Sequence, residues 1–264
     1  MKAIVLAAGY AVRLYPLTKD KPKPLLEVKG KTILDHIIGK IEELNVDQIF
    51  VVTNNKFYQN FEDWLKTASH RIPIKIINDH TTSNEDRKGA IGDIHYVISQ
   101  EQIDDDLLII AGDNLFNFSL KEMENEFAEL RKNMVALYDV GLLERAKKFG
   151  IAELDGNGKM IDFVEKPENP STTLAATCIY FFPRETIALI DKYLKENNNP
   201  DAPGYLIAWL YKNSEVFGKR FTKKWFDIGS FEGLEKARNE FKTDEPEVLE
   251  QEPEEKPRKP GEYF

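Results

Sequence analysis

The chain has 264 residues and a formal net charge of -9, with 42% hydrophobic and 31% charged residues. This length and composition predict one large folded domain or two small ones, and they exclude a disordered chain. The acidic balance argues against a nucleic-acid partner, because phosphate backbones attract basic surfaces. No apolar run reaches the roughly 18 to 20 residues of a membrane-spanning helix, so we expect no membrane partner either.

Short β-branched runs alternate with helical patterns over the first 140 residues. Strands are predicted at AIVLA near residue 5, QIFVVT, IPIKII, LLIIAGD and MVALYDV. Helices are predicted over residues 33–44, 57–68, 90–98 and 120–131. The alternation predicts an α/β fold with βαβ crossovers and a doubly wound, mostly parallel sheet. Ligands should gather at the carboxyl ends of its strands.

After residue 140 the pattern changes to closely spaced strands. GIAELDGNGKMIDFVEKP predicts a hairpin around residues 155–158, ATCIYFF a strand and ETIALIDKYL a helix. We expect a smaller antiparallel subdomain over about residues 141–229, laid over the sheet within a domain of residues 1–242. Residues 243–264 are dense in Glu and Pro without apolar periodicity, which predicts a solvated, disordered tail, with an interaction tail as the alternative.

The single cysteine, Cys178, cannot form an internal disulfide and lies in an apolar run, so we expect it in the core. The N-terminal MKAIVLAAG predicts a strand and a glycine turn rather than a signal peptide. Both features fit a reducing, cytoplasmic location.

Residues 6–26, LAAGYAVRLYPLTKDKPKPLL, place a cationic loop directly after the first predicted strand. Gly9 permits close approach of a ligand and Arg13 offers a charge-assisted fork, which together suit a polyphosphate. A Walker A loop ending at Lys31 is excluded, because its first glycine would fall at Leu25. A G-x-G-x-x-G motif fails as well, because Ala11 and Leu14 follow Gly9.

The same loop resembles the signature of the sugar-1-phosphate nucleotidyltransferases, close to L-A-A-G-x-G-T-R-L-x-P-L-T followed by P-K-P-L. It departs from that pattern at Ala11 and Val12. Further resemblances follow in order along residues 1–240. They are Gly89-Ala90-Ile91-Gly92, Asp113 after LLIIAG, Phe149-Gly150-Ile151, Glu165-Lys166-Pro167 and Trp225-Phe226-Asp227-Ile228-Gly229.

The resemblance implies a Rossmann-like nucleotidyltransferase fold and transfer of a nucleotidyl group from a nucleoside triphosphate to a sugar 1-phosphate, with Mg²⁺. The implied nucleotide-binding residues are Leu6, Ala8, Gly9, Ala11, Arg13, Gly89 and Asp113. The implied sugar-phosphate-binding residues are Lys23, Gly150, Glu165 and Lys166. All but Lys23 lie in the predicted antiparallel part. Asp113 and Asp227 would hold the metal, and Arg13, Lys23 and Asp113 would be catalytic. Family frequency favours thymidylyl or uridylyl transfer to glucose 1-phosphate, and a homo-oligomer is possible.

Asp113 is also a magnesium candidate by position, because it follows an apolar strand at the predicted carboxyl edge. Two alternatives stay open. The changes at Ala11 and Val12 would suit a non-catalytic regulatory paralogue that binds nucleotide or sugar phosphate. A nucleotide-sugar-dependent glycosyltransferase would use a D-x-D motif at a strand end, whereas Asp104-Asp105-Asp106 precedes its strand and predicts a solvated turn.

Overall fold

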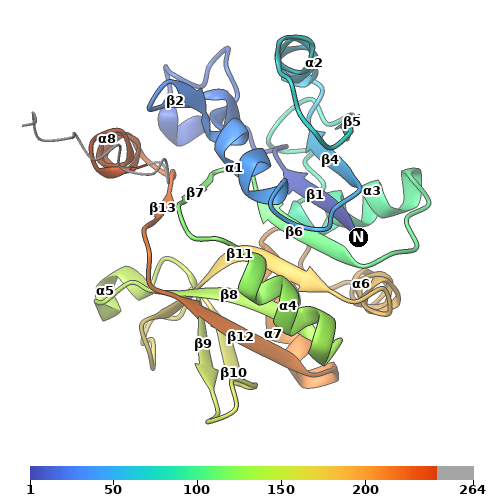
Figure 1. The fold of residues 1–264 in the computed structure, drawn as a ribbon, viewed down its shortest axis with the longest axis vertical. Coiled ribbons are helices and arrows are strands. Elements are labelled where there is room, and N and C mark those ends of the chain that lie inside the picture. Colours follow the sequence, from blue (N-terminus) through green and yellow to red (C-terminus); the bar gives the residue numbers. More distant parts are fainter. Residues whose placement is uncertain (243–264) are drawn as a thin grey trace, which may run out of the picture.

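The computed structural model describes residues 1–242, and the tail predicted over residues 243–264 lies outside this range. Figure 1 shows a large central sheet with helices packed on both of its faces. Within residues 1–242, no helix combines the length and the apolar character that crossing a membrane requires.

The central sheet has nine strands and is parallel in its N-terminal half. Its main order is β10-β9-β11-β6-β1-β4-β5, and β8 pairs with both β11 and β12. The mutually parallel strands are β1 (Lys2–Leu6), β4 (Gln48–Thr53), β5 (Ile74–Asn78) and β6 (Leu107–Ala111). The remaining strands are β8 (Asn133–Asp139), β9 (Gly150–Leu154), β10 (Met160–Glu165), β11 (Leu174–Phe182) and β12 (Val216–Phe221). These pairings confirm the predicted doubly wound, mostly parallel architecture.

The antiparallel part begins at β11, which pairs antiparallel with β6, β8 and β9. The predicted hairpin forms β9 and β10, with Gly150 opposite Glu165 at its open end. A register shift between Ala176 and Tyr180 bends β11 next to the end of β6. The antiparallel strands therefore continue the central sheet instead of forming a separate layer over it.

Alternating side chains of the strands pack into two main hydrophobic cores, one on each face of the sheet. Ala3 and Val5 pack in one core, and Ile4 packs in the other. Helices on the first face are α1 (Ile33–Ile41), α2 (Tyr58–Thr67), α4 (Lys121–Leu130) and α8 (Phe231–Glu240). Helices on the second face are α3 (Ala90–Gln100), α6 (Thr186–Lys195) and α7 (Pro203–Asn213). The short elements are the 3-10 turns η1 (Val12–Leu14) and η2 (Lys23–Leu25), the strands β2 (Glu27–Val28), β3 (Lys31–Thr32), β7 (Asn114–Phe116) and β13 (Trp225–Asp227), and the helix α5 (Leu143–Ala146).

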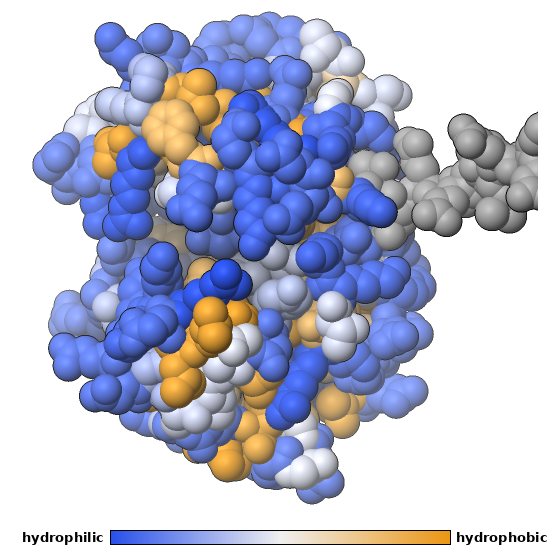
Figure 2. All heavy atoms as spheres, turned by 90° about the vertical axis from the view of Figure 1, so that its left-hand side faces the viewer, coloured by the Kyte–Doolittle hydropathy of each residue, from blue (hydrophilic) through white to orange (hydrophobic). Residues whose placement is uncertain are grey.

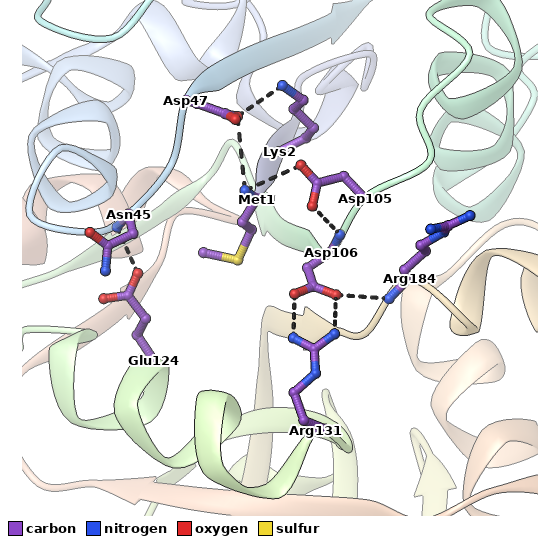
Figure 3. Close-up of polar contacts among 9 residues, drawn as sticks. All are labelled: Met1, Lys2, Asn45, Asp47, Asp105, Asp106, Glu124, Arg131 and Arg184. Carbon is purple, nitrogen blue, oxygen red and sulfur yellow. Dashed lines mark hydrogen bonds and ion pairs between the residues drawn. The ribbon is translucent and has the colours of Figure 1, made fainter.

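An ion-pair network ties the elements together at the amino ends of the parallel strands (Figure 3). The Met1 ammonium lies 3.3 Å from an oxygen of Asp105. The Asp106 carboxylate accepts two hydrogen bonds from the Arg131 guanidinium, and a third, of 3.0 Å, from the backbone N–H of Arg184. Residues 104–106 lie before β6, at the edge of the sheet opposite the carboxyl ends, where ion pairs hold Asp105 and Asp106 instead of leaving them in the predicted solvated turn.

Candidate active site

Two aspartates distant in the sequence meet at the carboxyl edge of the sheet. Asp113 lies in the turn between β6 and β7, and Asp227 is the last residue of β13. β13 pairs antiparallel with β7, which places Asp227 opposite Asn114. The backbone N–H of Ile228 donates to the carbonyl of Asp113 across 3.2 Å. Backbone pairing, and not a local motif, thus brings the two predicted metal ligands together.

The pKa of Asp227 responds to charged side chains in its neighbourhood. Burial and then the neighbouring Asp113 carboxylate raise the pKa of Asp227 to about 6. The charges of Lys23, Lys166 and Arg13 act in the opposite direction. Cationic side chains from the loop after β1 and from the end of β10 are therefore close enough to Asp227 for their charges to act on it.

Lys23 is held directly by one of these carboxylates. Its Nζ donates to Asp113 Oδ2 across 2.7 Å, and the two side chains are 18% and 30% exposed. Burial acts to lower the pKa of Lys23, but the charge and hydrogen bond of Asp113 outweigh it and the pKa is raised. Lys23 consequently stays an ammonium ion in a partly buried position.

Hydrogen bonds from other protein groups to its backbone carbonyls hold the loop after β1 in place. Gly112 N–H donates to Leu6 O, Asn54 Nδ2 to Ala8 O, and Thr18 Oγ1 to Ala11 O, at 2.8, 2.8 and 2.7 Å. Ala11 has φ 49°, a left-handed conformation that glycine adopts more easily than alanine. The loop keeps this conformation although alanine stands where the resembling signature has glycine. Gly9 and Arg13 lie on its exposed side.

The hairpin of β9 and β10 supplies the remaining predicted residues. Glu165 ends β10 opposite Gly150, and Lys166 follows with φ 48° and its Nζ 3.6 Å from Glu165 Oε1. The Glu165 side chain is only 8% exposed. Burial raises the pKa of Glu165, and the adjacent Lys166 charge partly opposes this. A buried carboxylate and an exposed ammonium are therefore presented side by side.

The contacts around Gly89, another predicted nucleotide-binding residue, involve α3 and the segment before α7. Gly89 precedes α3, whose first N–H groups, from Ala90 and Ile91, donate to Asp201 O and Pro200 O at 3.0 and 2.9 Å. Arg87 forms an ion pair with the Asp201 carboxylate at 2.8 Å. Hydrogen bonds and an ion pair thus connect the start of α3 with the segment before α7. No sequence motif predicts this connection.

Cys178 packs against the second hydrophobic core, which fits the predicted core position, and it also lies near the carboxylates of the candidate site. It is half-buried, with φ 54°, within the irregular stretch of β11. Burial raises the pKa of its thiol, and the charges of Asp113 and Glu165 add to that shift. The bend in β11, which periodicity cannot predict, places this residue at the edge of the site.

A second carboxyl pair lies under the loop after β5. Asp79 and Asp93 are 1% and 6% exposed, and burial and then Asp79 raise the pKa of Asp93 to about 8. Asp79 accepts from Thr81 Oγ1 at 2.8 Å, and Tyr10 OH lies 3.2 Å from that same oxygen. This chain of contacts links the loops after β1 and β5, and the sequence contains no spacing signal for it.

The donor set at Asp113 and Asp227 fits a hard divalent cation. Both side chains offer carboxylate oxygens, and the Asp113 charge adds to the burial that raises the pKa of Asp227, a repulsion that a cation would relieve. Among residues 1–242, no group of three or more His, Cys, Asp or Glu side chains is arranged to hold a metal ion. Two carboxylates without a complete protein cage match the way Mg²⁺ shares its coordination with substrate phosphates and water.

The molecular surface is hollowed on this side. Figure 2 shows a furrow between an upper and a lower half of the molecule, with hydrophilic side chains along most of its rim. Such a concave, polar surface suits charged small molecules more than an apolar ligand.

Comparisons with known proteins bear on the family and the fold. A family model described as nucleotidyl transferase matches residues 2–244. The chain is 32% identical over 231 residues to the bifunctional protein GlmU of Methanocaldococcus jannaschii, covering 87% of this chain and 51% of that protein. It is 31% identical over 186 residues to the UTP–glucose-1-phosphate uridylyltransferase AglF of Haloferax volcanii, covering 69% of this chain and 72% of that protein.

The fold has solved counterparts. A structure of UDP-glucose pyrophosphorylase complexed with UDP-glucose superposes with a TM-score of 0.76 at 22% identity, covering 90% of this chain and 97% of that one. The chain spans about half the length of the bifunctional archaeal relative.

Proposed function

The chain belongs to the nucleotidyl transferase family, and from this premise we propose that it transfers a nucleotidyl group from a nucleoside triphosphate to a sugar 1-phosphate. The products are a nucleoside diphosphate sugar and pyrophosphate. The observation that carries the proposal is the cluster at the carboxyl edge, where Lys23 contacts Asp113 at 2.7 Å and Asp227 lies beside them.

The reaction needs positioning and charge neutralisation more than proton transfer. The sugar phosphate is already an anionic nucleophile, so its oxygen attacks the α-phosphorus in line without a general base. Arg13 and Lys23 offset the negative charges of the two reactants as they approach. The ammonium of Lys23 passes from Asp113 to the incoming phosphate, and no covalent enzyme intermediate forms.

Asp113 and Asp227 are the residues that would hold Mg²⁺. When bound, this ion supplies charge neutralisation at the phosphate oxygens. Glu165 accepts hydrogen bonds from the sugar hydroxyls, Gly150 leaves the space in which the Glu165 carboxylate lies, and Lys166 contacts the phosphate. Leu6, Ala8, Gly9, Ala11 and Gly89 line the nucleotide through their backbone.

For the substrates, we propose uridylyl or thymidylyl transfer to glucose 1-phosphate. The Haloferax relative carries UTP and glucose 1-phosphate in its name, which supports this choice over a cytidylyl or guanylyl transfer. We also place the activity in the cytoplasm, as the single cysteine suggests.

Two observations weigh against the alternatives. Ala11 adopts φ 49°, a left-handed conformation open to glycine as well, so the alanine is compatible with a loop that glycine could also form, and this weighs against a non-catalytic paralogue. Asp105 and Asp106 are engaged at the amino edge by Met1 and Arg131, far from where a glycosyltransferase D-x-D motif would act.

The test is a pyrophosphate-release assay with four triphosphates against a panel of sugar 1-phosphates in the presence of Mg²⁺. We expect turnover with UTP or dTTP and glucose 1-phosphate. Tight nucleotide binding without pyrophosphate release from any pair would contradict the proposal and favour the regulatory alternative.

A further inference from the structure

The Glu165 carboxylate lies against two glycines that belong to different elements. A Cβ atom built on Gly204 would lie 1.8 Å from Glu165 Oε2 and 2.7 Å from its Cδ. A Cβ on Gly150 would lie 2.7 Å from the same oxygen, Oε2, and 2.3 Å from Phe163 Cζ. Real Cβ atoms essentially never approach a neighbour within 3.0 Å, so a side chain at either position would have to displace something.

The two glycines come close to Glu165 for different reasons. Gly150 pairs directly with Glu165 in the hairpin, so its proximity follows from the register of β9 and β10. Gly204 is the second residue of α7, which packs across β10 on the second face of the sheet. Because Gly204 has no side chain, the Glu165 carboxylate can occupy the space next to the first turn of α7.

We propose that Gly204 is a positioning residue, whose missing side chain lets the Glu165 carboxylate rest against the first turn of α7 and so fixes where it meets the sugar hydroxyls. This inference rests on the proposed function, because it takes Glu165 as the hydroxyl acceptor. Gly204 itself need not contact any substrate.

A methyl group at position 204 would affect the site more than the fold. Gly204 is not among the glycines with positive φ, so alanine fits its backbone and normally favours a helix over glycine. The atoms that the methyl group would meet are the end of one flexible side chain, which can rotate away. Rotation moves the carboxylate out of the position that the pocket now enforces.

The central experiment compares Gly204→Ala with Gly39→Ala. Gly39 lies within α1, and a Cβ there would meet nothing within 4 Å, so this variant tests a helical glycine without a steric neighbour. We expect Gly204→Ala to raise the KM for the sugar phosphate by about tenfold to a hundredfold, the effect of losing a hydrogen bond to a charged group. The KM for the triphosphate should stay unchanged, and the melting temperature should not fall. Gly39→Ala should match the wild type in both KM values.

A second comparison separates positioning from general damage. Glu165→Asp shortens the side chain by one methylene, so a methyl group at position 204 has no carboxylate left to displace. Gly204→Ala added to Glu165→Asp should therefore change the KM for the sugar phosphate by less than about threefold, a coupling that independent effects would not produce.

The outcomes are distinguishable. An unchanged KM for the sugar phosphate in Gly204→Ala, or an equal rise in both KM values, would overturn the inference while wild-type turnover upholds the proposed function. A wild type that releases no pyrophosphate with any substrate pair would overturn the proposed function, and the role of Gly204 toward the sugar with it.

Discussion

At the residue scale, the site combines groups that motifs reveal with groups that only folding brings together. Lys23 and Asp113 were predicted separately, and their contact at 2.7 Å joins two motifs into one cluster. Gly204 and Cys178 were not predicted as site residues, because nothing in their local sequence points to Glu165 or Asp113. Their placement depends on how α7 crosses β10 and how β11 bends.

The pair Asp79 and Asp93 leads to a prediction about pH. The pKa of Asp93 is about 8 in the folded protein, against about 3.9 in an unfolded chain. Between these values the folded protein retains a proton that the unfolded chain releases. The free energy of unfolding should therefore fall as pH rises from 4 to 8, by at most about 1.4 kcal/mol per pH unit from this group.

Asp93→Asn removes this titration and keeps a donor for Asp79. Relative to the wild type, the variant should gain stability steadily from pH 5 to pH 8, as urea unfolding at each pH would measure. Glu129→Gln, an exposed change on α4, should follow the wild-type curve. Parallel curves for Asp93→Asn and the wild type would show that Asp93 is ionised throughout this range.

At the scale of elements, the sequence predicts strands and helices well where apolar periodicity is uninterrupted. The helix predicted over residues 33–44 forms as Ile33–Ile41. Its N-cap is Thr32, whose side chain forms a capping box with Asp35. The helix α7 begins with Pro203 and is apolar on most sides, so no clear amphipathic stripe marks it. The short pair of β7 and β13 depends on a long-range contact and has no local signal.

Asp106 connects β6, α4 and the start of α6, so we predict that Asp106→Asn destabilises the fold. An amide cannot accept both Arg131 donors and the Arg184 N–H as the carboxylate does. The expected loss is about 1 to 3 kcal/mol in urea unfolding. Asp104→Asn is the control, because its side chain is 67% exposed and its pair with Arg184 lies on the surface. Equal effects of the two variants would contradict the structural role of Asp106.

At the scale of the whole molecule, the alternation of strands and helices sufficed to predict the sheet, and the candidate site is proposed at the carboxyl edge of its strands. The continuity of the antiparallel strands with that sheet was not predicted, because β11 serves both parts and its pairing partners are remote in sequence. The predicted site residues come from both parts, so the proposed function needs both.

Truncation after Lys242 should leave turnover within about threefold of the full chain. Both hydrophobic cores and every site residue lie before this position, and Lys242 is itself in contact with Asn117. Pyrophosphate release by the two proteins, with melting curves as a folding control, measures this. A collapse of turnover in a folded truncated protein would assign the tail a part in catalysis.

The central claim is that Asp113 and Asp227 act together on one divalent cation. We predict that Asp113→Asn and Asp227→Asn each lower kcat by about two to three orders of magnitude, the effect of removing one preorganised electrostatic group. The double variant should be little worse than either single one, because the same ion cannot be lost twice. The decisive measurement is Mg²⁺-titrated pyrophosphate release by the four proteins, with melting curves to confirm folding. Normal turnover of both single variants at low Mg²⁺ would contradict the account.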